Sequence, residues 1–170
     1  MSLMKRNLLP YLLCAALLML APLATAEMKL SDFKVESYKE IVARYQDSSF
    51  LMVLWSVDCP PCIEELPTLG KFHQLHPEAN LIMVSTDGEY HKDNIQQLMR
   101  EHGLDDIQQW VFSSVPLQAM RYAIDPTWYG ELPRSYFHYK QHKRQVKSGR
   151  LDEDVLSAWI EMVNNRTAGL

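Results

Sequence analysis

Two cysteines separated by two prolines are the residues of this chain best suited to carry out chemistry. Cys59-Pro60-Pro61-Cys62 follows an apolar run over 50–54, which is typical of a buried strand, and precedes a helical pattern. A Cys-x-x-Cys pair at the junction of a strand and a helix is an arrangement that supports thiol–disulfide exchange. The sequence therefore predicts a redox-active disulfide between Cys59 and Cys62, and no further cofactor.

The third cysteine, Cys14, lies in a segment that has the pattern of a secretory signal peptide. A positively charged start is followed by an apolar stretch, and Ala24-Thr25-Ala26 offers a small-x-small cleavage site. We expect residues 1–26 to be removed and residues 27–170 to form one domain in the periplasm. An uncleaved anchor in the inner membrane is the alternative, but the apolar stretch is shorter than the roughly 20 residues that span a bilayer.

The charge and the cysteine count exclude some classes of protein. Lys5 and Arg6 are the only charged residues among the first 26, so removing that segment changes the formal net charge from −4 to −6. An acidic chain gives no reason to expect nucleic-acid binding. In an oxidising compartment a lone cysteine pair suits catalysis, and no second Cys-x-x-Cys pattern supplies the two further ligands of a zinc site. Five basic residues gather in a predicted hairpin, either as a solvated surface or as a docking patch: Lys140, Lys143, Arg144, Lys147 and Arg150.

The elements that must position the cysteines follow from the periodicity of the apolar residues. Helices are predicted around 38–45, 66–75, 95–99, 116–120 and 152–163, and strands around 50–55, 81–84, 110–112, 135–139 and 145–148. Ser37 and Asp152 are predicted helix caps, and Gly103 is predicted to end a helix. Strands and helices alternate until the hairpin, which predicts an α/β sandwich with a central mixed sheet flanked by helices.

With this motif in place, the chain resembles the thioredoxin-like fold, and more narrowly the TlpA/ResA-like thiol–disulfide oxidoreductases of bacterial envelopes. That group typically has Phe-Trp-Ala-x-Trp-Cys-x-Pro-Cys, followed by a glutamate and a proline. The matching residues here are Trp55, Cys59, Cys62, Glu65 and Pro67. The resemblance implies a thioredoxin-like sandwich in which Cys59 exchanges with client cysteines and Cys62 resolves the mixed disulfide.

A further motif of thioredoxin-like proteins is a cis-proline beside the disulfide, just before a strand. Gly130-Glu131-Leu132-Pro133 precedes the predicted strand 135–139, so the resemblance makes Pro133 the candidate. Leu132 and Pro133 are then expected to form the surface on which a client chain docks.

Glu65 has two interpretations. The resemblance implies that it relays the proton that Cys62 must lose. Alternatively, it is a carboxylate in the first turn of the helix, where the helix dipole favours negative charge.

The residues beside the cysteines are expected to set the redox potential. Asp58 stands where the related proteins have tryptophan, and its charge disfavours the Cys59 thiolate. Pro60 and Pro61 have no N–H group to donate to the Cys59 sulfur. Both features favour a reductant over a strong oxidant. The positive end of the helix dipole acts in the opposite direction, because it stabilises the Cys59 thiolate.

These observations predict a periplasmic thiol–disulfide oxidoreductase that reduces disulfides of exported proteins. The resemblance makes proteins of cytochrome c or copper-site maturation plausible clients, and it implies a membrane thiol–disulfide electron donor. A net oxidant or isomerase is one alternative. A chaperone that holds Cu(I) between Cys59 and Cys62 is another, because soft thiolates suit that ion.

Overall fold

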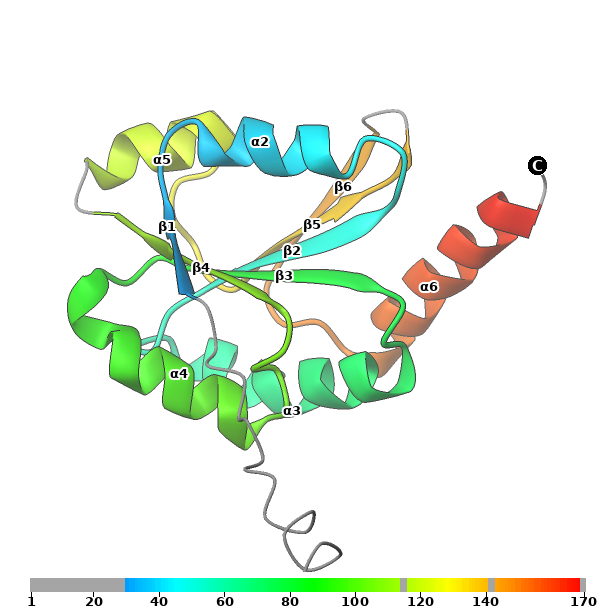
Figure 1. Ribbon diagram of the computed structural model, residues 1–170, viewed down its shortest axis with the longest axis horizontal. Helices are drawn as coiled ribbons and strands as arrows, with labels where there is room; N and C mark the ends of the chain where they lie inside the picture. Colours follow the sequence, from blue (N-terminus) through cyan, green and yellow to red (C-terminus); the bar gives the residue numbers. More distant parts are fainter. Residues whose placement is uncertain (1–29, 114–115, 141–142, 169–170) are drawn as a thin grey trace, which may run out of the picture.

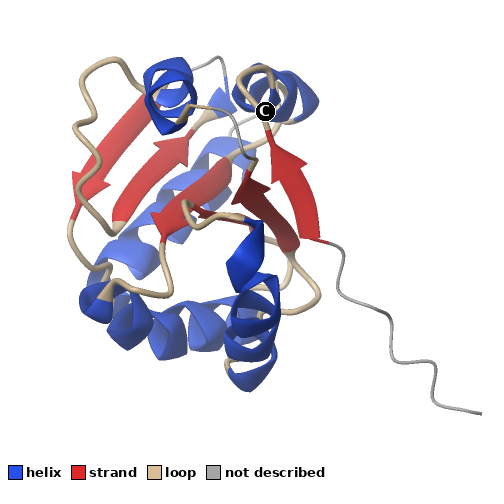
Figure 2. Cartoon of the chain, turned by 90° about the vertical axis from the view of Figure 1, so that its left-hand side faces the viewer, coloured by secondary structure: helices blue, strands red, loops and turns tan. Residues whose placement is uncertain are grey.

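The computed structural model describes residues 30–113, 116–140 and 143–168. The predicted signal peptide and Cys14 therefore lie outside the described residues. Six strands form one sheet in the order β1-β4-β3-β2-β5-β6, with helices on both faces (Figures 1 and 2). The strands are β1 (Leu30–Phe33), β2 (Phe50–Trp55), β3 (Asn80–Ser85), β4 (Gln108–Phe112), β5 (Arg134–His138) and β6 (Arg144–Ser148). The helices are α2 (Ser37–Arg44), α3 (Pro60–Leu75), α4 (Lys92–Glu101), α5 (Leu117–Ile124) and α6 (Glu153–Ala168), with a short 3-10 helix at Glu89–His91.

The sheet is mixed, as the order of the elements predicts. β1, β4, β3 and β2 pair in parallel, whereas β5 is antiparallel to both β2 and β6. All six residues of β2 are buried because helices cover both faces of this central strand. β1 was not predicted: it has only four residues and is defined by its pairing with β4.

Each face of the sheet carries its own hydrophobic core. Helices α3, α4 and α6 cover one face, and α2 and α5 cover the other (Figure 1). The first core includes Trp55, Cys62, Leu66, Leu69, Ile95, Met99, Leu156 and Trp159, and the second includes Phe33, Ile41, Phe50, Met120, Ile124 and Trp128. Leu132 packs against both cores, which places the loop before β5 at the junction of the two layers.

The predicted helix ends are correct in two cases and wrong in one. The Asp152 carboxylate accepts a hydrogen bond from the Val155 N–H at 2.9 Å, and Gly103 follows α4 with a positive φ of 64°. Ser37, however, is the first residue of α2, and its hydroxyl accepts from the Lys34 N–H instead of capping the helix. The turn before α2 places the Lys34 N–H at 3.0 Å from the hydroxyl oxygen, which therefore bonds to the turn and not to the helix.

The predicted burial of one apolar helix residue, Leu75, is also wrong. Leu75 was expected to continue the buried face formed by Leu66, Leu69 and Phe72. Leu75 is the last residue of α3. Its side chain is 64% exposed, because the buried face of α3 ends at Phe72, one turn earlier.

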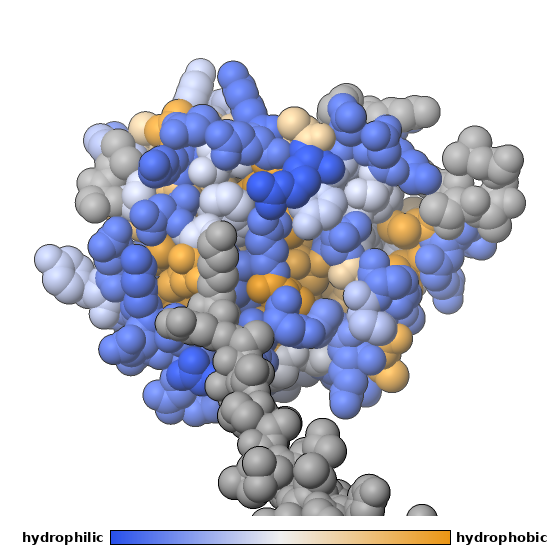
Figure 3. Space-filling model, viewed as in Figure 1, coloured by the Kyte–Doolittle hydropathy of each residue, from blue (hydrophilic) through white to orange (hydrophobic). Residues whose placement is uncertain are grey.

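The described part of the chain contains no helix that is both long and apolar enough to cross a membrane. The face shown in Figure 3 is hydrophilic over most of its area, and its hydrophobic patches are small and separate. The apolar residues of the described chain are thus used mainly in the two cores.

Candidate active site

The two cysteines lie where the central strand β2 passes into α3. Cys59 is the N-cap of α3, with extended backbone angles, and it forms a disulfide with Cys62. The backbone N–H of Cys62 points at the Cys59 sulfur, with the nitrogen 3.3 Å from Sγ. Pro60 and Pro61 occupy the first helical turn, where a missing N–H costs no helical hydrogen bond. The helix therefore begins at the Cys-x-x-Cys motif, and the Cys59 sulfur lies at the positive end of the helix dipole.

The two sulfur atoms differ in accessibility. Cys59 is half-buried, whereas Cys62 is 1% exposed and belongs to the core under α3. Asp58, Pro60 and Pro61 are all exposed around the first cysteine. A molecule in solution can therefore reach the Cys59 sulfur, whereas the Cys62 sulfur is shielded from solvent.

The turn before Cys59 is held by Asp87, a residue that sequence reasoning did not single out as part of the site. One carboxylate oxygen accepts the Ser56 hydroxyl at 2.7 Å, and the other accepts the Val57 N–H at 2.9 Å. The Ser85 hydroxyl donates to the same carboxylate at 2.7 Å. The Asp58 N–H in turn donates to the Ser56 hydroxyl oxygen at 3.1 Å. Asp87 thus fixes the loop on which Cys59 is carried. Its position directly after β3, the parallel neighbour of β2, was the signal available in the sequence.

Glu65 is buried in α3, one helical turn after Cys62 and on the same side of the helix. It lies beyond the first turn, so the interpretation of Glu65 as a first-turn carboxylate is wrong. One of its oxygens accepts the Leu151 N–H at 2.8 Å, and the other has no hydrogen-bond partner among the described residues. Burial raises the pKa of Glu65 to about 7, although the Leu151 N–H and the charges of Arg150 and Lys147 act to lower it. This carboxyl can exchange a proton near neutral pH beside the inner cysteine.

The peptide bond between Leu132 and Pro133 is cis, as the resemblance implied. The register that pairs Leu54 with Arg134 places Pro133 beside the end of β2, at the same edge of the sheet as the disulfide. Pro133 is buried and its carbonyl accepts the Gly149 N–H at 2.9 Å, whereas Leu132 is half-buried. The structure thus brings the proline loop and the cysteine motif to one site.

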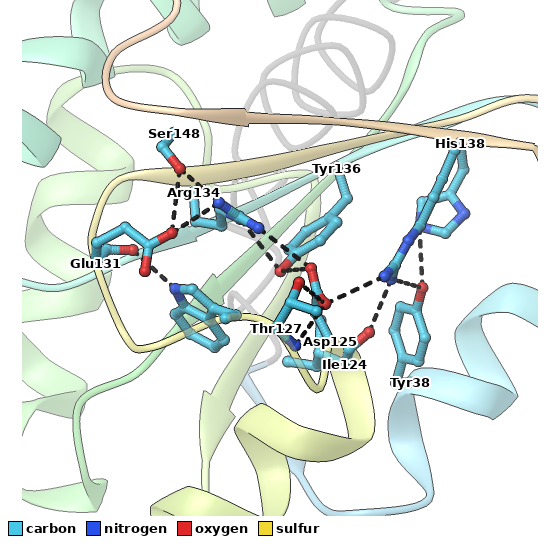
Figure 4. Close-up of polar contacts among 11 residues, drawn as sticks. Tyr38, Ile124, Asp125, Thr127, Glu131, Arg134, Tyr136, His138 and Ser148 are labelled. Atoms are coloured by element: carbon cyan, nitrogen blue, oxygen red, sulfur yellow. Dashed lines mark hydrogen bonds and ion pairs between the residues drawn. The ribbon is translucent and has the colours of Figure 1, made fainter.

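A buried polar cluster lies directly behind this loop (Figure 4). Its centre is the Asp125 carboxylate at the end of α5, which accepts hydrogen bonds from the Thr127 hydroxyl at 2.7 Å and from the Tyr136 hydroxyl at 3.3 Å. Arg134, the residue after the cis-proline, forms an ion pair with it at 3.2 Å, and Arg144 forms another at 3.5 Å. Burial acts to raise the pKa of Asp125, but the hydrogen bonds from Thr127 and Arg134 outweigh it and hold the carboxyl below its ordinary pKa. Sequence reasoning missed this cluster because its members come from three separate elements.

Replacing Asp125 with asparagine should destabilise the protein by about 3 kcal/mol, because it leaves two arginines beside an uncharged group. The loss should be smaller at acidic pH: a carboxyl with a lowered native pKa contributes stability above its unfolded pKa and loses that contribution as the pH falls. Urea unfolding at pH 7 and at a pH well below 3.8, the ordinary pKa of an aspartate, measures both effects.

Glu131→Gln is the matched control for Asp125→Asn. Glu131 also pairs with Arg134, at 2.7 Å, but it is exposed. Its replacement should cost less than about 1 kcal/mol. Equal losses for the two variants would contradict a special role for the buried carboxylate.

The five basic residues near the C-terminus do not act as one patch. Arg144 points into the polar cluster and donates to the Tyr38 hydroxyl and to the Ile124 carbonyl, both at 2.8 Å. Arg150 pairs with Glu64 across α3. At least these two cations therefore hold elements of the fold together. Within the described residues there is no group of three or more potential metal ligands.

Trp128 and Tyr129, in the loop before Pro133, differ in their roles. Trp128 is buried in the second core, and its indole N–H donates to the Glu131 carbonyl at 2.9 Å. Tyr129 is 90% exposed. Trp128 is therefore a packing residue of the loop, and Tyr129 belongs to its surface.

The comparisons with known proteins agree with this fold. No protein-family model and no curated protein sequence matches the chain. Among solved structures, a secreted disulfide oxidoreductase of Mycobacterium tuberculosis that is homologous to E. coli DsbE matches with a TM-score of 0.57 and 15% identity, over 71% of this chain and 85% of its own. The thioredoxin domain of a thiol–disulfide oxidoreductase from Bacteroides vulgatus matches with a TM-score of 0.57 and 16% identity, over 72% and 84%. A secreted thiol–disulfide isomerase from Corynebacterium glutamicum matches with a TM-score of 0.58 and 18% identity, over 72% and 75%.

At these identities the comparisons establish the fold and not the activity. The chain is a thioredoxin-like α/β protein, as the sequence predicted. Within that fold it carries a Cys59–Cys62 disulfide at the start of a helix, beside a cis-proline loop.

Proposed function

We propose that this protein is a thiol–disulfide oxidoreductase that reduces disulfides of exported proteins in the periplasm. The observation that carries the proposal is the pairing of a half-exposed Cys59 with a buried Cys62 at the start of α3, next to the cis-proline Pro133. The three solved structures described above, which have the same fold, are named as disulfide oxidoreductases or isomerases, and two are named as secreted. The signal-like segment 1–26 supports export of this chain.

The reaction begins with the reduced pair. The Cys59 thiolate attacks one sulfur of a client disulfide, forms a mixed disulfide, and expels the other client sulfur as a thiolate, which takes up a proton. Cys62 then loses its proton to the Glu65 carboxylate and attacks the Cys59 sulfur. This step forms the Cys59–Cys62 disulfide and releases the second client thiol. Two electrons pass from the protein to the client, and a thiol–disulfide donor in the membrane must return them.

The client is held by the loop before β5. Its extended chain lies along Leu132 and Pro133 and pairs as a short strand with the backbone of Leu132, so that its disulfide meets Cys59. Because Cys62 is buried beneath Cys59, the client contacts only the outer sulfur until the mixed disulfide is resolved.

The groups around Cys59 favour a reducing pair. The backbone N–H of Cys62 is near the Cys59 sulfur, but Pro60 and Pro61 offer no N–H. Asp58 adds negative charge directly before Cys59. A less stabilised thiolate makes the reduced form easier to oxidise, so we expect a reduction potential closer to that of thioredoxin, about −270 mV, than to that of DsbA, about −120 mV.

Replacing Asp58 with tryptophan should lower the thiol pKa of Cys59 and raise the reduction potential. Because Asp58 is exposed, its charge is screened, and the expected rise is only roughly 5–20 mV. Equilibration with glutathione buffers measures the potential, and pH-dependent alkylation measures the thiol pKa.

Asp58→Asn separates the charge from the bulk of the tryptophan and should give a rise of similar size. An unchanged or lower potential in both variants would refute the electrostatic argument. A wild-type potential near that of DsbA would instead support the net oxidant and overturn the proposed direction.

A further inference from the structure

A pocket of about 160 Å³ opens beside the proline loop, on the α5 side of the sheet. It is lined by Thr86, Phe112, Leu117, Arg121, Trp128 and Gly130. A cavity needs only about 10–15 Å³ to hold one water molecule, so this one can admit a side chain. None of its lining residues has a part in the disulfide exchange described above.

The pocket is attached to both halves of the active site. The Thr86 N–H donates to the carbonyl of Trp55, the last residue of β2, at 2.9 Å. Gly130 precedes Pro133 by three residues, which limits their separation to about 10 Å along the chain. A client chain docked at Pro133 therefore reaches the pocket within a few residues of its reacting cysteine.

The pocket presents one cation among polar and apolar lining residues. The Arg121 guanidinium donates to the Tyr129 carbonyl at 3.3 Å, and among the described residues no carboxylate lies within ion-pair distance of it. Arginine has five N–H donors, so most of them remain for a ligand. Phe112 and Trp128 line the pocket beside it, so a ligand carboxylate on Arg121 would also lie against aromatic side chains.

The backbone of the proline loop passes close to this arginine. Gly130 has a positive φ of 101°, and a side chain at this position would collide with the Arg121 guanidinium. The rim of the pocket carries Leu117, which is 47% exposed, and the exposed Tyr129 follows Trp128 in the loop. A chain that places an acidic group on Arg121 can thus contact apolar surface at the same time.

We propose that this pocket is a client-recognition subsite that binds an aspartate or glutamate side chain within about four residues of the client's reacting cysteine. The inference rests on the proposed function and adds the chemical class of client that it prefers. The selection acts through charge complementarity between the client carboxylate and Arg121, in the form of a charge-assisted hydrogen bond.

The test uses short synthetic peptides, each with one cysteine joined by a disulfide to neutral 2-mercaptoethanol. Glutamate, glutamine or lysine is placed in turn at each of the four positions on either side of the cysteine. The rate at which the pre-reduced protein cleaves each disulfide is measured in a single turnover, which requires no membrane donor. At one or two positions the glutamate peptide should react about threefold to tenfold faster than its glutamine match, and added salt should reduce this preference.

Variants of Arg121 identify the residue responsible. Arg121→Gln should abolish the preference, Arg121→Lys should keep part of it, and Arg121→Glu should reverse it in favour of lysine peptides. Bis(2-hydroxyethyl) disulfide, which carries no charge for residue 121 to select, should react at the same rate with all four proteins within about twofold. A mere loss of loop structure would slow every peptide and could not reverse the preference.

The outcomes separate this inference from the proposed function. Equal rates for glutamate and glutamine at every position in the wild type, or an unchanged preference in Arg121→Gln, would overturn the subsite and leave the reductase intact. Failure of the wild type to cleave any of the disulfides would overturn the proposed function itself.

Discussion

Mixed disulfides with client proteins should accumulate on Cys62→Ser and be absent from Cys59→Ser. Cys59 is the half-exposed N-cap of α3, whereas Cys62 is buried below it. Without Cys62 the first attack still occurs, but no second sulfur can release the client. Without Cys59 the attack itself is lost, and turnover should fall by on the order of a thousandfold or more. Non-reducing gels of envelope extracts, beside a disulfide-reduction assay, measure both results.

The double variant with serine at both positions is the control for adducts that form by other routes. If Cys59→Ser collects the adducts instead, the roles of the two cysteines are reversed. If neither variant forms adducts and both retain full reductase activity, the protein is not a dithiol oxidoreductase.

Glu65→Gln should remove a pH dependence from both stability and rate. The native pKa of Glu65 is raised to about 7, so the folded protein binds the proton more tightly than the unfolded chain does. Stability is therefore lost as the pH rises from about 4.5 to 7, by up to roughly 3 kcal/mol. The glutamine variant should lack this slope and be the more stable protein at pH 8. Urea unfolding of the oxidised form at pH values from 5 to 8 measures the difference.

The rate effect concerns the second step of exchange. If Glu65 takes the proton from Cys62, the glutamine variant should resolve mixed disulfides at least about tenfold more slowly, and the step near pH 7 in its rate profile should disappear. Stopped-flow mixing of the reduced protein with a peptide disulfide follows this resolution.

Glu64→Gln is the matched control for Glu65→Gln. Glu64 is the preceding residue of α3, is exposed, and pairs with Arg150. Its replacement should change neither profile appreciably. A Glu65→Gln variant that keeps the wild-type pH slope in stability and rate would refute both the buried titration and the proton relay.

Most of the fold could be predicted from the sequence because its strongest signals are local. The continuous apolar run over 50–54 predicted the central strand, and the helix that follows the cysteines was evident from its apolar spacing. β1 could not be predicted in this way, since four residues carry too little periodicity and the strand depends on its partner β4. The Ser37 cap failed for a related reason: the hydroxyl had two backbone donors within reach, and the geometry of the turn selected one.

The sequence by itself determined the chemistry of this protein: a Cys-x-x-Cys pair whose first member starts a helix and a proline suited to the loop before a strand. Only the tertiary structure decided which groups surround that pair. Asp87 lies in the loop that follows a neighbouring strand, Asp125 and Arg134 come from separate elements, and Arg121 is placed beside the proline loop by the packing of α5. The physical reason is that motif chemistry and helix caps depend on residues a few positions apart. Burial, ion pairing and pockets arise only when segments distant in the sequence pack together.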